Sequence, residues 1–126
     1  MVGVLVDESS RVLIAQRPVG KRHAGSWEFP GGKLQPGEDR IIGLARELRE
    51  ELGISIESPT PLIQVEHEYS YGQVLLDVWV VRHFNGIPQG LDGQLLRWCP
   101  LDALESAGLL PADRPILAEL LLLESL

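Results

Sequence analysis

Residues 31–54 combine a pair of adjacent glycines with a run of acidic residues, and both can take part in chemistry. If the acidic run is helical, Glu47, Glu50 and Glu51 share one face, because positions three and four apart are neighbours on a helix. Clustered carboxylate oxygens suit a hard divalent cation such as Mg²⁺. The alternative is a charged face exposed to solvent, and the periodicity alone leaves both open.

The acidic run has the pattern of an amphipathic helix over residues 38–52. Its apolar residues recur at steps of three and four, at Ile41, Leu44, Ala45, Leu48 and Leu52. Gly53 provides a helix stop. Glu38 is expected at the helix start, where the helix dipole favours a carboxylate, and Arg46 is expected to pair with Glu50 one turn further on.

The spacing of the chemically active residues decides between a cation site and a solvated face. After Gly32 come five residues and Glu38, then seven residues and an Arg-Glu-Leu triplet, then Glu-Glu and Gly-Ile pairs after single-residue gaps. This pattern resembles the signature of the Nudix hydrolases at every fixed position. The resemblance implies one or more Mg²⁺ ions, with Mn²⁺ as an alternative, held by the Gly31 carbonyl and by the carboxylates of Glu47, Glu50 and Glu51. Arg46 would orient these glutamates, and Glu38 would brace the loop.

Three further segments resemble the 8-oxo-dGTP diphosphatases of the MutT type within this family. They are residues 27–33 before the metal loop, residues 92–98 in a late acidic loop and residues 111–116 at the start of the last helix. The resemblance implies that Asp92 is a metal ligand or the base that activates water. It also implies a nucleotide pocket lined by Arg17, Arg22, Glu28, Phe29, Pro30, Gly31 and Asp113.

Asp113 departs from the MutT pattern, which has an asparagine at this position. An amide both donates and accepts hydrogen bonds, whereas an ionised carboxylate only accepts. Guanine stays compatible, because its N1–H and exocyclic amine can donate, while discrimination of the 8-oxo form is left open. The alternative role for Asp113 is an N-cap of the last helix, with Pro115 in the first turn.

The loop of residues 18–26 is basic and precedes the metal loop in the chain. Arg17 and Arg22 are candidates to bind phosphate, because a guanidinium group forms two parallel hydrogen bonds to phosphate oxygens. Ordinary surface charge is the alternative for both. For Asp92, likewise, the alternative is a solvated residue in a turn-rich loop.

The resemblance implies Mg²⁺-dependent hydrolysis of a nucleoside triphosphate to a monophosphate and pyrophosphate. The expected substrate is 8-oxo-dGTP, whose removal would protect DNA replication from mutation. A carboxylate of Glu47, Glu50 or Asp92 would take the proton of the attacking water. The alternatives are another Nudix substrate, such as ADP-ribose or a dinucleoside polyphosphate, and a nucleotide-binding module without activity.

The composition fits one domain, residues 1–126, with 44% apolar residues to build a single core. The net charge of −7 argues against binding of polymeric nucleic acid and leaves a small-molecule nucleotide as the expected partner. No apolar run reaches the ~18 residues of a membrane span, and the first residues lack a basic signal region. We therefore expect no membrane contact and a cytoplasmic monomer, with a dimer and a fragment of a longer protein left open.

The order of the expected elements along the whole chain resembles the Nudix fold, which implies an α+β class with a mixed sheet sandwiched between helices. Strands are expected over residues 2–6, 11–17, 27–30, 62–71, 74–84 and 95–98, and a last helix over residues 115–123. The first two strands are expected to form a hairpin, because turn-forming residues separate them.

Overall fold

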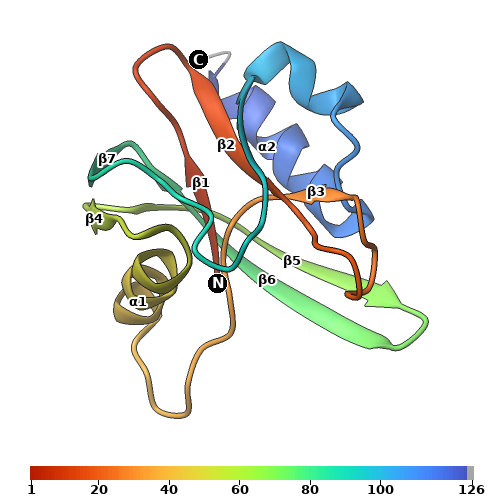
Figure 1. Cartoon of the computed structure of the whole chain (residues 1–126). Helices are drawn as coiled ribbons and strands as arrows, with labels where there is room; N and C mark the ends of the chain where they lie inside the picture. Colours follow the sequence, from red (N-terminus) through yellow and green to blue (C-terminus); the bar gives the residue numbers. More distant parts are fainter. Residues whose placement is uncertain (125–126) are drawn as a thin grey trace.

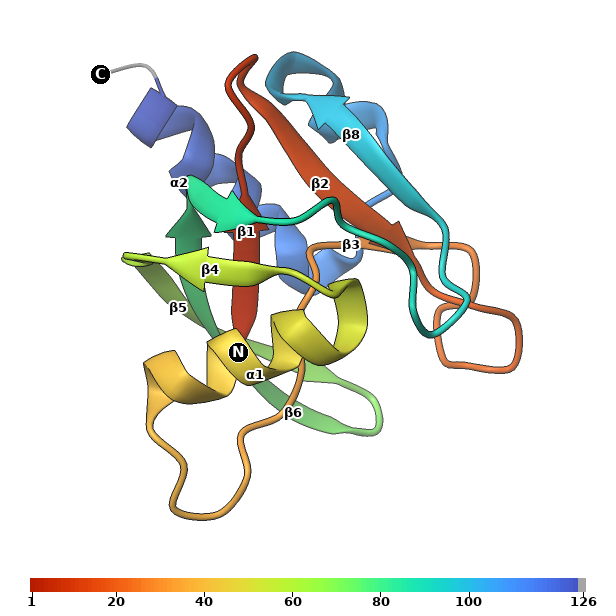
Figure 2. The same cartoon turned by 60° about the vertical axis from the view of Figure 1, so that its left-hand side comes forward.

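The computed structural model describes residues 1–124 of the chain (Figures 1 and 2). Its strands are β1 (Val2–Leu5), β2 (Arg11–Gln16), β3 (Trp27–Glu28), β4 (Ser55–Glu57), β5 (Thr60–Tyr69), β6 (Gly72–Val81), β7 (His83–Asn85) and β8 (Leu96–Pro100). Its helices are α1 (Arg40–Leu52), α2 (Arg114–Glu124) and the two short 3₁₀ segments η1 (Leu101–Ser106) and η2 (Pro111–Asp113). Among these elements, no helix is long and apolar enough to cross a membrane.

The central sheet is mixed, with the order β1–β6–β5. β1 runs parallel to β6, and β5 runs antiparallel to it. Side chains alternate along β6, so that Val78 and Val80 pack with α2 while Trp79 and Val81 pack with α1. The sheet therefore lies between the two helices, as Figure 1 shows, which confirms the predicted architecture.

The expected hairpin of the first two strands is wrong. A turn does form, since the Asp7 N–H donates to the Arg11 carbonyl at 3.0 Å and Val6 forms an isolated bridge with Val12. Beyond it the strands diverge, β1 to pair with β6 and β2 to pair with β3 and β8 (Figure 2). Both strands are largely buried, so their apolar residues favour a strand without specifying its partner.

Helix α1 has a defined cap at each end. Asp39 Oδ2 accepts hydrogen bonds from the N–H groups of Ile41 and Ile42 at 3.1 and 3.2 Å. Glu38, which was expected at the helix start, therefore lies just outside the cap. Gly53 has a left-handed φ of 72° and ends the helix where the sequence predicts.

Helix α1 packs closely on β1. A Cβ at Gly3 would lie 2.9 Å from Leu48 Cδ1, so a larger residue would require the Leu48 side chain to shift. Leu44, Leu48 and Leu52 are fully buried, whereas Ile41, expected on the same face, is 44% exposed because the buried part of α1 begins after its first turn. Since the start of the chain and β1 also hydrogen-bond residues 30–32, the glycine loop, this packing sets the position of α1 relative to that loop.

Candidate active site

The glycine loop, residues 30–32, lies along the start of β1. The Pro30 carbonyl accepts a hydrogen bond from the Gly3 N–H at 2.9 Å, and the Gly32 N–H donates to the Met1 carbonyl at 3.0 Å. These backbone contacts hold the loop alongside β1 and next to α1.

Glu47 reaches the glycine loop from α1. A Cβ at Gly32 would overlap Glu47 Oε2, so glycine is the residue that leaves room for this carboxylate. Arg46 Nη1 donates to Glu47 Oε1 at 2.9 Å and to Glu50 Oε2 at 3.1 Å. The Glu47 side chain is 13% exposed and that of Glu50 58%, so Glu47 lies at the loop and Glu50 at the solvent edge.

Arg46 is the centre of this ion-pair network. Its Nε and Nη2 donate to the two oxygens of Glu38 at 2.6 and 2.9 Å, and Nη2 also donates to the Lys33 carbonyl at 3.0 Å. Glu38 Oε1 accepts the Gln35 N–H at 3.0 Å. The hydrogen bonds from Arg46 lower the pKa of Glu38 to about 2. These contacts favour the roles predicted for the two residues, the orientation of the glutamates by Arg46 and the bracing of the loop by Glu38, and both roles stay predictions.

Glu51 lies on the inner side of α1 and is half-buried. Burial raises its pKa to about 7, and the neighbouring charges of Glu47 and Asp92 add to this effect, although the Gly31 N–H donates a hydrogen bond to it. A carboxyl group in such surroundings is stabilised by a proton or by a cation that offsets its neighbours.

The loop that carries Asp92 docks on the end of α1. The Leu91 N–H and the Gln94 side chain both donate to the Glu51 carbonyl, at 3.1 and 3.4 Å. The Asp92 N–H donates to Gln94 Oε1 at 2.9 Å, which shapes the turn. Asp92 itself is exposed and lines the same cleft as Glu51.

The donor set suits a hard divalent cation in its chemistry. It consists of closely spaced carboxylates, and the pKa of Glu51 is raised mainly by burial and further by the neighbouring charges of Glu47 and Asp92. Within residues 1–124, no three acidic, histidine or cysteine side chains already converge on one point. The reason is visible in the network, because the carboxylates of Glu47 and Glu50 turn toward Arg46.

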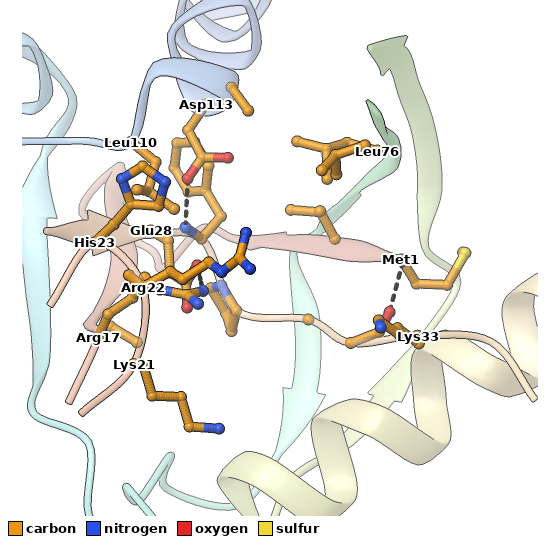
Figure 3. A pocket seen from close by; sticks show the side chains of 18 of the residues that line it. Met1, Arg17, Lys21, Arg22, His23, Glu28, Lys33, Leu76, Leu110 and Asp113 are labelled. Carbon is orange, nitrogen blue, oxygen red and sulfur yellow. Dashed lines mark hydrogen bonds and ion pairs between the residues drawn. The ribbon is translucent and has the colours of Figure 1, made fainter. Parts of the chain in front are cut away.

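A cleft of about 1350 Å³ extends from the glycine loop to the start of α2 (Figure 3). Arg46, Glu47 and Glu50 lie outside its lining. The other predicted site residues all line it, namely Arg17, Arg22, Glu28, Phe29, Pro30, Gly31, Glu51, Asp92 and Asp113. Tertiary structure thus brings together the substrate-binding residues that the resemblance implies.

Asp113 faces this cleft. The residue is 4% exposed, and its Oδ2 accepts a hydrogen bond from the Phe29 backbone N–H at 3.4 Å (Figure 3). Burial raises the pKa of Asp113 to about 7, and the nearby Glu28 adds to the effect. The carboxyl group is therefore engaged across the cleft, which favours the pocket role over the alternative of a helix cap.

The two arginines expected to bind phosphate also line the cleft, where protein groups hold them. Arg17 Nη1 pairs with Glu28 Oε2 at 3.0 Å, and its Nε donates to the Arg22 carbonyl at 2.7 Å. The Arg22 guanidinium lies 3.7 Å from the centre of the Tyr71 ring. Figure 3 shows Arg17 and Arg22 at the end of the cleft that holds Glu28 and Asp113.

Sequence reasoning missed two groups that line the cleft. The first is Tyr69 and Tyr71 on the β5–β6 hairpin, which alternate with polar residues and so share a face with His67. Only the packing of the hairpin shows that this face meets the cleft. The second is Arg40, whose Nη2 donates to Asp77 Oδ1 at 2.9 Å and joins α1 to β6.

A family profile described as NUDIX domain matches residues 1–119. The chain belongs to the NUDIX domain family. It is 40% identical over 118 residues to CTP pyrophosphohydrolase of Escherichia coli (strain K12), covering 93% of this chain and 87% of that protein. It is 33% identical over 119 residues to 8-oxo-dGTP diphosphatase of the same strain, covering 94% and 92%.

The fold of this NUDIX domain also matches solved structures. The solution structure of the E. coli ORF135 protein superposes with a TM-score of 0.83 at 37% identity, covering 98% of this chain and 89% of that one. The family and fold implied by the signature are thus confirmed.

Proposed function

We propose that this NUDIX domain is a metal-dependent hydrolase that converts a nucleoside triphosphate to a monophosphate and pyrophosphate. The observation that carries the proposal is a single cleft with two chemically different ends. The carboxyl group of Glu51 lies at one end, and the buried Asp113 lies at the other. A nucleoside triphosphate has the same polarity, with phosphates suited to a cation site and a base suited to a hydrogen-bonding group among apolar side chains.

Mg²⁺, or Mn²⁺ as an alternative, would be held by Glu47, Glu50, Glu51, Asp92 and the Gly31 carbonyl, and would neutralise phosphate charge and activate water. Arg46 holds Glu47 and Glu50 in place through its two hydrogen bonds. A carboxylate of Glu47, Glu50 or Asp92 would accept the proton of the attacking water. Arg17, which lies toward the Asp113 end of the cleft (Figure 3), would exchange its pairing with Glu28 for an oxygen of the sugar or of the phosphate next to it.

The expected substrate is 8-oxo-dGTP, and its hydrolysis would keep this oxidised nucleotide out of DNA. The base would lie against Phe29 and Pro30 and face Asp113. Burial favours the neutral form of Asp113, which donates and accepts like an amide. A neutral carboxyl group can donate to O6 of 8-oxoguanine and accept from its N7–H. The aspartate is therefore compatible with the role that asparagine has in the MutT type.

A second candidate is a cytidine triphosphate, and two observations favour it. One is the 40% identity to a CTP pyrophosphohydrolase. The other is the chemistry of Asp113, since a neutral carboxyl group can accept from the cytosine amine and donate to N3. Either substrate uses the same phosphate chemistry, so the two candidates differ at the base and in the 2′-hydroxyl group of the sugar.

Steady-state hydrolysis with Mg²⁺ of a panel of 8-oxo-dGTP, dGTP, CTP and ADP-ribose tests the proposal. We expect one or both of 8-oxo-dGTP and CTP to have the highest kcat/KM. The Asp113→Asn variant should change the ranking of the nucleotides by kcat/KM more than it changes the rate with the preferred nucleotide. The Glu51→Gln variant, purified in parallel, controls for contaminating hydrolases.

Two results would overturn the proposal. Faster hydrolysis of ADP-ribose than of every triphosphate would assign the domain to a different Nudix activity. Binding of nucleotides with no turnover of any of them would identify a module without activity.

A further inference from the structure

Tyr71, at the tip of the β5–β6 hairpin, makes three contacts with other aromatic or basic side chains. Its ring centre lies 3.7 Å from the Arg22 guanidinium, and its hydroxyl group lies 3.2 Å from His23 Nε2. Its ring also stacks on that of Tyr69, with centroids 5.1 Å apart and planes within 4°. Two of the three partners belong to the basic loop of residues 18–26, which follows β2.

Tyr69 gives this cluster a fixed base. Its hydroxyl group accepts a hydrogen bond from the Ala112 N–H at 3.2 Å, next to Asp113, and its ring contacts that of His23 at 5.1 Å. Tyr69 is half-buried in the wall of the cleft. The hairpin tip is therefore anchored to the same segment that places Asp113.

Backbone hydrogen bonds close the basic loop at its base and also occur within it, from the Lys21 N–H to the Pro18 carbonyl at 3.4 Å and from the Ser26 N–H to the His23 carbonyl at 3.0 Å. The Arg17 N–H donates to the Ser26 carbonyl at 2.9 Å, and the Gly25 N–H donates to the Arg17 carbonyl at 3.0 Å. Val19, further out in the loop, is 97% exposed. His23 has a φ of 57°, a left-handed conformation that side chains other than glycine adopt at a cost. The contacts of His23 with the two tyrosines offset this cost.

The contacts continue from the loop to the floor of the cleft. Arg22 stacks on Tyr71 by its side chain and accepts Arg17 Nε by its carbonyl at 2.7 Å. Arg17 in turn pairs with Glu28 at 3.0 Å. These contacts connect the hairpin tip through Arg22 to Arg17, which pairs with Glu28.

We propose that Tyr71 is a positioning residue that latches the basic loop onto the hairpin and so sets the place of Arg17 and Arg22 in the nucleotide cleft. The loop latch is the set of contacts that Tyr71 makes with Arg22 and His23. The identity of the ligand rests on the proposed function, whereas the latch itself rests on the contacts above.

Limited proteolysis of the folded protein by trypsin tests the latch without any nucleotide. The loop carries cleavage sites after Lys21 and Arg22, while the bond after Arg17 precedes proline and resists trypsin. We expect Tyr71→Ala to accelerate loop cleavage about threefold to tenfold, since it removes one cation–π contact and one hydrogen bond. Tyr71→Phe keeps the ring and loses the hydroxyl group, so its loop should be cleaved at a rate between those of Tyr71→Ala and the wild type.

The matched control is Val19→Ala, which alters the same loop at a side chain outside the cleft lining. Its cleavage rate should equal that of the wild type. Mass spectrometry and a melting curve should show that Tyr71→Ala accelerates cleavage in the loop alone, with an unchanged Tm. Equal loop cleavage in Tyr71→Ala and wild type would overturn the latch.

Kinetics test the positioning role. We expect Tyr71→Ala and Arg22→Ala each to raise KM for the best triphosphate about threefold to tenfold with little change in kcat, and the double variant to add little to either. An unchanged KM in a variant whose loop is cleaved faster would overturn the positioning role. If the wild type hydrolysed no triphosphate, the proposed function would fail, and the trypsin rates would still decide for or against the latch.

Discussion

The Phe29 backbone N–H donates a hydrogen bond to Asp113 Oδ2 at 3.4 Å, although the two residues are 84 positions apart in the chain. Phe29 follows β3 and Asp113 precedes α2, so this bond joins two separate parts of the fold across the cleft. It also explains why a buried carboxyl group is tolerated there, since one of its oxygens has a donor.

Replacing Asp113 by asparagine should stabilise the protein at high pH. The pKa of Asp113 is raised from 3.8 to about 7, so between these values the folded state holds a proton that the unfolded state releases. This stabilisation is complete below pH 3.8 and is lost as the pH rises through about 7. The amide has no such dependence and keeps an oxygen for the Phe29 N–H.

Urea unfolding of both proteins from pH 5 to pH 8 measures this effect. The stability of Asp113→Asn relative to wild type should increase with pH by about 1 kcal/mol or more. The exposed acid on η1 supplies a control, Asp102→Asn, whose difference from wild type should be flat. A flat difference for Asp113→Asn as well would show that Asp113 ionises normally.

The charge of Glu47 and Glu51 should be essential for turnover. Glu47→Gln and Glu51→Gln keep the shape of the side chain but remove the negative oxygens that suit a divalent cation, so kcat should fall about 100-fold or more. Calorimetric titration with Mg²⁺ should show weaker binding in both variants. Glu66→Gln, at an exposed position of β5, should behave as the wild type. An unchanged rate in either active-site variant would contradict the metal site.

Gly32→Ala should damage activity while leaving the fold intact. The new methyl group would overlap Glu47 Oε2, which is the far end of a flexible side chain and can move away at little cost. The carboxylate would then leave the glycine loop. We expect a kcat loss of about tenfold or more with a change in stability below about 1 kcal/mol. Full activity would mean that the place of Glu47 beside Gly32 has no part in turnover.

The pairing of Glu38 with Arg46 should contribute to stability only at a pH where Glu38 is ionised. The pKa of Glu38 is lowered from 4.5 to about 2, so its contribution is present above pH 4.5 and is lost as the pH falls through about 2. Glu38→Gln should therefore unfold at lower urea than wild type at pH 7, with a difference that shrinks toward pH 2. The control Glu8→Gln, in the turn after β1, should show no such trend; a constant deficit for Glu38→Gln would point to packing.

Much of the site could be predicted because its residues lie close together in the chain. Arg46, Glu47, Glu50 and Glu51 follow one another on a single helix, so local periodicity already places them within reach of one another. Gly53 ends the helix in a left-handed conformation that glycine adopts without strain, and the sequence shows this directly. The acidic helix follows from such local rules, whereas the family and the α+β fold were implied by the resemblance of the signature to that of the Nudix hydrolases.

Tertiary structure alone decided how distant segments meet. The apolar residues of β1 favour a strand. Its pairing with β6 and not with β2 depends on which strand supplies its hydrogen bonds and on which helix packs against it. The same holds for contacts between side chains that have several possible partners. Asp113 accepts from the Phe29 N–H, and Tyr71 contacts Arg22 and His23. Glu47 and Glu50 both pair with Arg46. Local sequence determines the type of an element and the chemistry it carries. The choice among long-range contacts belongs to the packed chain as a whole, because each contact competes for the same buried surface and the same hydrogen-bonding groups.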